Sequence, residues 1–266
     1  MKKRLEELIA ADSCDNYAAA VFEEFGLSVE KHYDVLVVAP AWKPTKIMNT
    51  YDVEITCTCE HAYCSGYEVK GADFLLAWVQ TSTGASSIID EVSLCAALDF
   101  DKLVFVGAVG SLVSEIGVGS LCTPSWCISG NLANGYLQED LAAYKPFGKV
   151  YPNDANFVDA VMNLAKKRGY DMKTAPVFCT DSIFGEYSHM DFIKSFGVSL
   201  IEMETSTFYL MADLMEKPAI ALFSVSDNSA TGVPLLLRSE DQKASYKKCC
   251  TEVIPLLIME IAKMNT

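Results

Sequence analysis

The chain has 266 residues, of which 51% are hydrophobic and 21% charged, and its net charge is −14 at pH 7. This length is enough for one large buried core, while the negative charge disfavours nucleic acid and anionic membrane surfaces as partners. No run of about 18 apolar residues predicts a membrane span. The ten cysteines are irregularly spaced in a long chain without a recognisable signal peptide. That pattern favours reduced thiols and a cytoplasmic location over a disulfide framework.

The first half of the chain alternates between apolar stretches of helical and of strand-like period. Gly26 is expected to end the first helix, and Pro40 to end the first strand. The predicted elements are, in order, an amphipathic helix over 4–25, strands over 34–39, 53–59 and 73–80, a helix over 84–98 and a buried strand over 103–106.

The second half continues the alternation after a long loop at 129–154, which is rich in Gly, Asn and Tyr. A loop of that length is often functional or an oligomer contact. Pro255 is expected to kink the last helix. The predicted elements are a strand over 120–128, a helix over 155–168, a strand over 176–180, a helical segment over 186–195, a strand over 197–201, a helix over 204–216, a strand over 219–223 and a helix over 239–264.

This alternation predicts an α/β fold, a three-layer single domain with a central mixed, mostly parallel sheet flanked by helices. We expect residues 1–32 to form an N-terminal helical extension and residues 33–266 to form the main domain. No internal repeat or low-complexity linker divides the chain further.

Three carboxylates follow two of the predicted strands. Glu202 and Glu204, with Met203 between them, come after the strand at 197–201, and Asp227 comes after the strand at 219–223. Ligands bind at the edge of an α/β sheet where the strands end. Paired carboxylates in such a crevice are suited to holding hydroxyl groups and delivering a proton.

Four motifs in this order resemble those of the nucleoside phosphorylase and nucleosidase superfamily. They are the helix-opening turn at 83–87, the glycine-rich segment at 106–112, the Glu-Met-Glu motif at 201–204 and the Ser-Asp pair at 226–227. The resemblance covers roughly residues 33–262. Within that superfamily, the chain resembles the branch that includes hexameric purine nucleoside phosphorylases and methylthioadenosine nucleosidases.

The resemblance implies cleavage of the N-glycosidic bond of a purine-type nucleoside, with phosphorolysis as the commonest activity of the family and no cofactor beyond phosphate or water. By resemblance, Glu204 holds the ribose hydroxyls, Met203 packs against the sugar, and Glu202 helps to position the substrate. Asp227 donates a proton to the purine, which requires a raised pKa that burial can supply. Further substrate contacts are expected from Thr83, Gly84, Gly107 and Ala108, and Phe184 is a candidate to stack on the base.

The phosphate-binding residues of the family are missing from this sequence. Relatives that use phosphate have a glycine and an arginine in the first loop, which here is 39–44 and contains neither. Phe105 and Ala108 stand where those relatives have an arginine and a serine or threonine. Since anions prefer fixed cationic donors, the remaining candidates for an anion site are Lys43, Lys46 and Arg238, of which Lys43 and Arg238 are the leading two. The glutamate of the nucleosidase branch is also absent from this loop. We expect phosphorolysis with a non-standard phosphate site, and the alternatives are a nucleosidase with an unusual water site and a non-catalytic nucleoside-binding protein.

Members of this family assemble as dimers, trimers or hexamers, so a homo-oligomer is expected. In some relatives a basic residue of a neighbouring subunit completes the site, and His61 is the candidate for that role in trans; an ordinary surface histidine is the alternative. The spacing of Cys57, Cys59, His61 and Cys64 matches no usual zinc pattern, so no metal is predicted.

Simpler interpretations exist for several of these residues. Glu202 and Glu204 can serve only to favour a helix N-terminus electrostatically. Asp227 lies in a turn-rich segment and can be an ordinary turn residue. Met203 can be a core residue. Trp42, in the altered first loop, either fills the space that phosphate occupies in relatives or simply packs.

Overall fold

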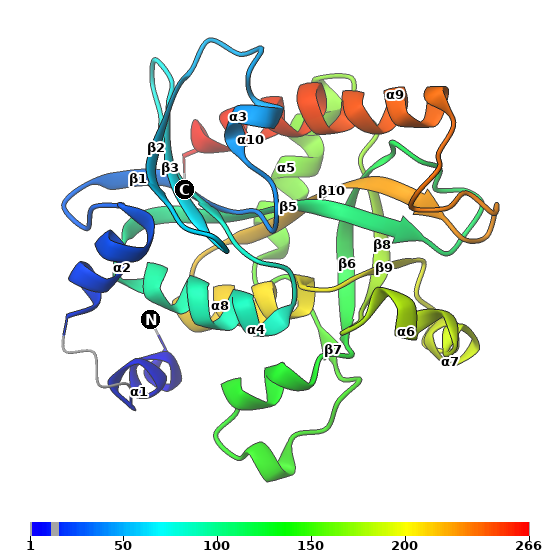
Figure 1. Cartoon of the computed structure of the whole chain (residues 1–266), viewed down its shortest axis with the longest axis horizontal. Helices are drawn as coiled ribbons and strands as arrows, with labels where there is room; N and C mark the ends of the chain where they lie inside the picture. The colour runs from blue at the N-terminus through cyan, green and yellow to red at the C-terminus, as the bar shows by residue number, and fades with distance from the viewer. Residues whose placement is uncertain (1, 12–15, 266) are drawn as a thin grey trace.

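The structure, a computed structural model, describes residues 2–11 and 16–265. Figure 1 shows how its elements are arranged. The helices are α1 (Lys3–Ala11), α2 (Tyr17–Phe25), α3 (Pro44–Ile47), α4 (Ala85–Leu94), α5 (Ala155–Lys167), α6 (Ile183–Tyr187), α7 (Met190–Lys194), α8 (Thr205–Met215), α9 (Glu240–Lys248) and α10 (Ile254–Ala262). Short helical turns are η1 (Cys95–Ala97), η2 (Leu132–Leu137), η3 (Leu141–Ala143) and the π-helical η4 (Cys249–Val253). The strands are β1 (His32–Val38), β2 (Glu54–Glu60), β3 (Ser65–Lys70), β4 (Leu75–Gln80), β5 (Asp99–Ser111), β6 (Leu121–Ser129), β7 (Lys149–Val150), β8 (Lys173–Cys179), β9 (Leu200–Glu202) and β10 (Ala219–Asn228).

One mixed sheet contains all ten of these strands. Its order is β10-β6-β8-β9-β5-β1-β4-β3-β2, and β7 pairs with β6. Because β10 also pairs with β5, the strands β5, β10, β6, β8 and β9 close into a ring, from which β1, β4, β3 and β2 continue as an open wing. Among the described strands, five of the ten pairings are parallel.

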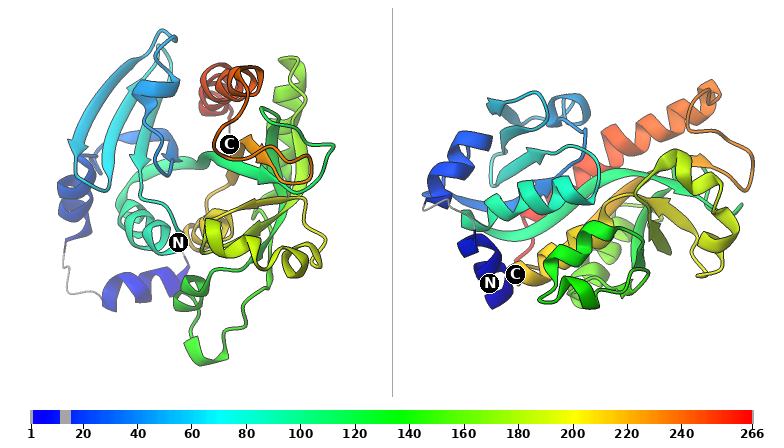
Figure 2. Two further views of the ribbon diagram at one scale, coloured as in Figure 1. Left: turned by 45° about the vertical axis from the view of Figure 1, so that its right-hand side comes forward. Right: turned by 60° about the horizontal axis from the view of Figure 1, so that its bottom comes forward.

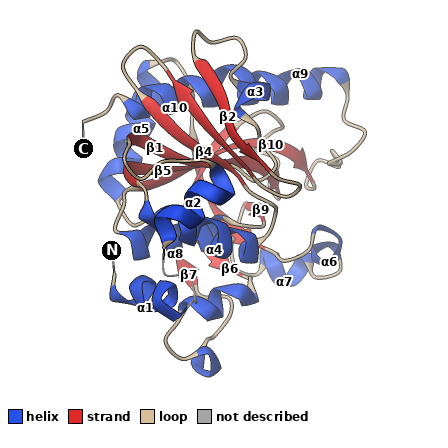
Figure 3. Cartoon of the chain, turned by 60° about the vertical axis from the view of Figure 1, so that its left-hand side comes forward, coloured by secondary structure: helices blue, strands red, loops and turns tan. Residues whose placement is uncertain are grey.

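The central strands have apolar residues on both faces, since helices cover both sides of the sheet. In β1, Leu36 and Val38 join one core cluster, whereas Val35 and Val37 join the other. The first cluster includes residues of α2, α4 and α8, and the second includes residues of α5 and α10. Figure 3 shows these helices on the two sides of the strands. The two-residue period of β1 therefore supplies both cores at once.

The predicted α/β class and mixed sheet with flanking helices are confirmed. The parallel pairings join β4, β1, β5 and β10 and join β6, β8 and β9, whereas the antiparallel ones are β2–β3, β3–β4, β5–β9, β6–β7 and β6–β10. The closure of the ring was not predicted. It depends on the pairing of β10 with both β5 and β6, and no local pattern in the sequence encodes such a pairing.

The N-terminal segment forms two short helices rather than the one helix predicted over 4–25. The middle of that prediction, residues 12–15, lies outside the described residues. Leu5 from α1 and Val21 and Phe25 from α2 are buried in the same core cluster as β1. The division of the chain into 1–32 and 33–266 stays a prediction.

Three further elements differ from the sequence prediction. Strand β3 was not predicted, and its burial depends on pairing with β2 and β4. The predicted loop at 129–154 contains η2, η3 and β7, and the η2–η3 segment extends away from the sheet in Figures 1 and 2. The last helix is interrupted by the π-helical η4 directly before α10, whose second residue is Pro255. A proline lacks the N–H that a regular helix needs, so the widened turn lies where the interruption was expected.

Among the described helices, none is both long and apolar enough to cross a membrane.

Candidate functional site

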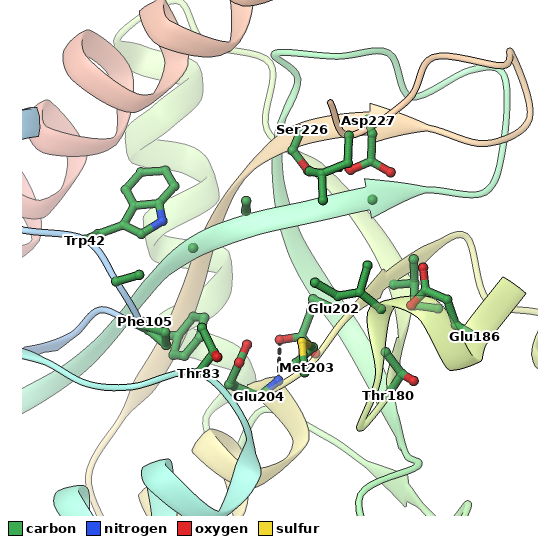
Figure 4. A pocket seen from close by; sticks show the side chains of 18 of the residues that line it. Trp42, Thr83, Phe105, Thr180, Glu186, Glu202, Met203, Glu204, Ser226 and Asp227 are labelled. Atoms are coloured by element: carbon green, nitrogen blue, oxygen red, sulfur yellow. Dashed lines mark hydrogen bonds between the residues drawn. The ribbon is translucent and has the colours of Figure 1, made fainter. Parts of the chain in front are cut away.

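A cavity of about 260 Å³ lies where β5, β9 and β10 meet the loops that follow β1, β4 and β8. That volume is close to the lower end of the roughly 300–1,000 Å³ typical of small-molecule sites. Figure 4 shows Trp42 and Phe105 at one end, Asp227 and Glu186 at the other, and the Glu202–Glu204 segment between them. The lining residues are Pro40, Ala41, Trp42, Thr83, Phe105, Gly107, Ala108, Gly110, Thr180, Ile183, Glu186, Tyr187, Ile201, Glu202, Met203, Glu204, Ser226, Asp227 and Leu235.

The middle of the cavity is formed by the Glu-Met-Glu motif between β9 and α8. The backbone N–H groups of Glu204 and Thr205 donate to Glu202 Oε2 at 2.7 and 2.9 Å, so Glu202 satisfies the start of α8. The backbone N–H of Gly84 donates to Glu204 Oε1 at 2.6 Å. These bonds fix both carboxyl groups to the backbone, and the bond from Gly84 joins Glu204 to a distant part of the chain. The Glu202 role at a helix N-terminus, one of the simpler interpretations, is therefore present together with its place in the cavity.

Burial controls the protonation of these two glutamates. Both side chains are almost fully buried. Burial, followed by the negative charge of Glu202, raises the pKa of Glu204 to about 8. Burial also raises the pKa of Glu202, although the Cys179 thiol, the Thr205 side chain and the backbone N–H groups of Glu204 and Thr205 oppose the shift. Glu202 Oε1 has no hydrogen-bond partner among the described residues. A buried oxygen without a partner is available to a donor on a ligand.

Asp227 reaches the cavity because of an irregularity in β10. Val225 pairs with Val109 and Asp227 pairs with Gly110, so Ser226 is an extra residue in the β10–β5 pairing. Such bulges re-aim side chains and are common beside active sites. The Ser226 hydroxyl donates to Asp227 Oδ1 at 2.6 Å and orients the carboxyl group.

Gly110 provides the space for this carboxyl group. A Cβ atom at Gly110 would lie 3.0 Å from Asp227 Oδ2 and 3.1 Å from the Ile201 side chain. The glycine motif at 106–112 therefore lets the backbone of β5 approach the aspartate closely.

The pKa of Asp227 is raised by burial, against the opposing effects of the Ser226 hydroxyl and the positive charge of Arg238. A carboxyl group with a raised pKa is better able to carry a proton at neutral pH. The direction of this shift agrees with the expected role of Asp227 as a proton donor.

Glu186 is a fourth carboxyl group in the cavity, and the sequence analysis did not identify it. It lies on α6, a helix of only five residues that begins at a Ser182 cap. Burial and the negative charge of Asp227 raise the pKa of Glu186 to about 7. The motif comparison gave no signal for this residue, because its approach to Asp227 depends on how α6 folds back over the sheet.

The opposite end of the cavity is apolar. Trp42 and Phe105 line it together with Pro40 and Ala41. Among the described residues that line the cavity, four carry carboxyl groups and none is Lys, Arg or His. The indole of Trp42 lies at the end where phosphate was expected from the resemblance.

The predicted anion site at Lys43 and Arg238 is corrected by the structure. The Lys43 ammonium pairs with Glu60 at 2.5 Å, and Lys43 does not line the cavity. Arg238 stacks over the Tyr246 ring at 4.5 Å and donates to the Ser226 carbonyl at 3.1 Å, also outside the lining. Each of these cationic side chains binds a partner outside the cavity, and these partners could not be identified from the sequence.

Most of the other predicted site residues come together. Thr83, Gly107 and Ala108 line the cavity, and Gly84 contributes through its hydrogen bond to Glu204. The prediction for Phe184 is corrected: its side chain is 89% exposed and does not line the cavity, whereas Ile183, Glu186 and Tyr187 do. The short α6 turns its lining face inward at 183, 186 and 187, so residue 184 points to solvent.

His61 lies at the end of the β2–β3 hairpin and is not among the cavity residues. Its Nε2 atom is 3.2 Å from Cys59 Sγ and 3.3 Å from the carbonyl of Glu23. A role in trans stays a prediction. Among the described residues, the one group with the spacing of metal ligands is His32, Asp34 and Asp101, which lies outside the cavity. Asp101 there already has Lys102 at 3.8 Å.

A buried asparagine joins the loops around the site and was not predicted. Asn131 Nδ2 lies within hydrogen-bond distance of the Thr180 carbonyl (3.2 Å), Asp181 Oδ1 (2.8 Å) and the Met203 carbonyl (3.1 Å). Its Oδ1 accepts from the Ser206 hydroxyl at 3.0 Å. Asn131 follows β6 in the loop at 129–154. Through its bond to the Met203 carbonyl, this loop helps to position the Glu-Met-Glu motif.

Comparison with known proteins places this geometry in a family. The model of the phosphorylase superfamily matches residues 67–257. The chain is 26% identical over 156 residues to the DeoD-type purine nucleoside phosphorylases of Anoxybacillus flavithermus and Geobacillus stearothermophilus. These matches cover 57% of this chain and 63% of each relative, so the chain spans less than two thirds of the curated relatives it matches.

The solved structures that share the fold include two nucleosidases. An AMP nucleosidase from Bacteroides thetaiotaomicron has a TM-score of 0.65 at 17% identity, covering 97% of this chain and 100% of that chain. A 5′-methylthioadenosine/S-adenosyl homocysteine nucleosidase from Campylobacter jejuni has a TM-score of 0.63 at 17% identity, covering 87% and 99%. At such identities the similarity concerns the fold alone. Since the family model matches well over half of its residues, this chain belongs to the phosphorylase superfamily.

Proposed function

We propose that this protein cleaves the N-glycosidic bond of a purine-type nucleoside. The observation that carries the proposal is one cavity that contains both the Glu-Met-Glu segment and Asp227. Purine nucleoside phosphorylases among the relatives, and nucleosidases among the structures of the same fold, act on substrates of this kind.

In this proposal the sugar lies over the Glu-Met-Glu segment. The Glu204 carboxyl group accepts from the ribose hydroxyls, and Met203 offers an apolar surface to the ring. As the bond between C1′ and N9 breaks, positive charge develops on the sugar and negative charge on the leaving base. The carboxyl oxygens that line the cavity without a cationic side chain favour a cationic sugar, and protonated Asp227 donates its proton to N7 of the purine.

For the nucleophile, the geometry favours water over phosphate. Phosphate binding in a buried site requires fixed cationic donors, and the described lining has four carboxyl groups and no cationic side chain. The Trp42 and Phe105 side chains line the end at which phosphate was expected. A water molecule needs neither a cation nor that space. Its oxygen would bond to C1′, and the proton it loses would pass to solvent or to a carboxylate of the cavity.

The test is release of free base from purine and pyrimidine nucleosides, with and without phosphate, followed by chromatography. We expect base release from purine nucleosides without phosphate, with ribose as the second product. Release that requires phosphate, with ribose 1-phosphate as the product, would show a rebuilt anion site and overturn the choice of water.

Asp227→Asn supplies the internal comparison, because the amide retains the shape of the side chain but has no acidic proton. We expect it to slow cleavage by about 100-fold or more while nucleoside binding changes little. Equal losses in both would argue against proton donation. No cleavage of any nucleoside by the wild-type protein, alongside calorimetric binding, would show a binding protein that has kept the pocket without the reaction.

A further inference from the structure

We propose that Glu186 determines which base is accepted, by receiving a hydrogen bond from an amino group at C6 of the purine. The inference rests on the proposed function, in which Asp227 contacts N7. It assigns a specificity role to a residue on α6 that none of the four family motifs contains. The expected substrate class is therefore the 6-aminopurine nucleosides.

The position of Glu186 is the first observation behind this assignment. Figure 4 shows its side chain extending from α6 into the end of the cavity that contains Asp227. Both residues line the cavity, and Thr180 lies below them at the same end. The Glu-Met-Glu segment separates this end from Trp42 and Phe105. A base whose sugar lies over that segment therefore has Asp227 and Glu186 as its two carboxyl neighbours.

The lack of a protein partner is the second observation. Within residues 2–11 and 16–265, no hydrogen bond or ion pair reaches the Glu186 carboxyl group, although it is about half buried. A partly buried carboxyl group without a partner is costly, and a ligand that donates to it repays part of that cost. Asp227, in contrast, already accepts from Ser226.

The chemistry of the purine ring connects these two carboxyl groups to one edge. N7 and the substituent at C6 are neighbours on the same edge of the base, so a group beside an N7 contact faces C6. An amino group at C6 donates to a carboxylate, whereas a carbonyl group at C6 places an acceptor against an acceptor. A site built to pair with a polar substituent rejects the analogue that cannot pair with it.

The charges around Glu186 add a pH dependence. Asp227 faces it from β10, Tyr187 neighbours it on α6, and Glu202 lies on β9, while Arg238 acts on Asp227 from outside the cavity. Burial and Asp227 raise the pKa of Glu186 to about 7. Below pH 7 the protonated carboxyl group can donate to a C6 carbonyl, so the preference for 6-amino over 6-oxo bases should fall. Since Asp227 also titrates, only the ratio between substrates reports on Glu186.

The experiment compares four nucleosides in the wild-type protein and in Glu186→Ala. They are adenosine (6-amino), inosine (6-oxo), purine riboside (no substituent) and 2-aminopurine riboside (amino group on another edge). Hydrogen bonds to charged groups contribute enough for about a 10- to 100-fold effect. We expect Glu186→Ala to lower kcat/KM for adenosine by this factor and to leave purine riboside and 2-aminopurine riboside within about 2-fold. Asp191→Asn, an exposed carboxylate on the next helix, is the matched control.

Each outcome separates this inference from the proposed function. An equal loss on all four nucleosides, or a loss specific to 2-aminopurine riboside, would overturn the role of Glu186 while cleavage itself stands. No cleavage of any of the four by wild-type protein would contradict the proposed function. The same four affinities measured by calorimetry would then decide the Glu186 assignment, which fails if Glu186→Ala binds adenosine as tightly as the wild type.

Discussion

Glu204 illustrates how a single side chain combines structural and ligand-binding demands. Its Oε1 atom accepts from the Gly84 N–H, which ties α8 to the turn before α4. Burial and Glu202 raise the pKa of Glu204 to about 8, because its negative charge is poorly solvated in the cavity. Hydroxyl groups of a ligand that donate to this carboxyl group would stabilise its charged form.

Glu204→Ala is expected to abolish measurable nucleoside binding, because two ribose hydroxyls lose their acceptor in a buried site. Isothermal calorimetry with wild-type protein, Glu204→Ala and the exposed control Asp159→Ala on α5 is the measurement. Unchanged affinity in Glu204→Ala would remove the sugar site from the Glu-Met-Glu motif. Circular dichroism establishes that the variant is folded, since loss of the Gly84 bond alone does not expose the core.

Gly110→Ala is expected to displace the Asp227 carboxyl group. The added methyl would lie 3.0 Å from Asp227 Oδ2, closer than most Cβ contacts allow. We expect catalysis to fall by about 10- to 100-fold, as for other small misplacements of reacting groups. Gly117→Ala is the matched control, because nothing lies within 4 Å of its Cβ position. Steady-state kinetics that change equally in both variants, or in neither, would contradict this role of Gly110.

The correction of Phe184 shows the limit of reading residues from motifs. The segment after β8 was expected to contribute to the site, and it does, through Ile183, Glu186 and Tyr187. Which residues of that segment point inward depends on the exact start of α6 at the Ser182 cap. A shift of one residue in a helix turns a side chain by about 100°, so motif position alone does not settle its direction.

At the scale of elements, α2 and β2 are held together at one glycine. Gly26 ends α2 with φ of 64°, and a Cβ atom there would lie 2.5 Å from the carbonyl oxygen of Thr58 in β2. The Thr58 hydroxyl in turn donates to the Phe25 carbonyl. The end of the helix and the edge of the sheet wing thus share one close contact.

Gly26→Ala is expected to destabilise the protein more than Gly169→Ala. Both glycines have positive φ, which costs an alanine roughly 1–2 kcal/mol. Nothing lies within 4 Å of a Cβ atom at Gly169, whereas Thr58 must move for Gly26→Ala, at roughly 1–3 kcal/mol more. Urea denaturation of the two variants measures the difference. Equal free energies of unfolding would show that the approach of β2 is not rigid.

Strands whose two faces are both buried in the core could be predicted from the sequence. The strands β1, β5 and β10 are buried on both faces and read as continuous apolar runs. The predictions at 103–106 and 219–223 therefore fall inside β5 and β10, and the prediction at 34–39 extends one residue past the end of β1. Strand β3 (Ser65–Lys70) has no such run, since its sequence mixes small, polar and apolar residues. It forms because β2 and β4 offer it partners, which is a tertiary effect.

At the scale of the whole molecule, buried carboxyl groups couple stability to pH. The pKa values of Glu186 and Glu91 are raised to about 7 and that of Glu204 to about 8, in each case mainly by burial. Their ordinary value is 4.5, so folding takes up protons between pH 4.5 and 8. The stability conferred by these groups is complete below pH 4.5 and is lost as pH rises through 7 and 8.

The Tm is therefore expected to fall between pH 6 and pH 9. The loss of unfolding free energy should be on the order of 1–3 kcal/mol, since Glu186 and Glu91 are partly exposed and their shifts are screened. Differential scanning calorimetry over this range is the measurement. Glu204→Gln should flatten the dependence, because a neutral amide takes up no proton. A Tm that is constant or rises from pH 6 to 9 would contradict the raised pKa values of these buried carboxyl groups.

Assembly remains a prediction at this scale. Phe184, Leu236 and Leu237 are at least 75% exposed, and Phe184 and Leu236 directly follow residues that line the cavity. Large exposed apolar side chains beside a site are typical of interaction surfaces. We expect multi-angle light scattering to give a mass that is a multiple of the 29.1 kDa chain. A monomer at micromolar concentration would contradict the homo-oligomer, and with it the role of His61 in trans.

The sequence by itself determined the α/β class and the order of most elements, because these follow from the local period of apolar residues. It also determined that the Glu-Met-Glu motif, Asp227 and the glycine turns lie near one another, because all of them are at the ends of strands. Only the tertiary structure decided that β10 closes the ring with β5 and β6, that Lys43 and Arg238 turn to Glu60 and Tyr246, and that Glu186 joins Asp227. Each of these depends on residues far apart in the chain. A long side chain pairs with the partner that is nearest in space, and the number of residues between two positions does not give their distance in the folded chain.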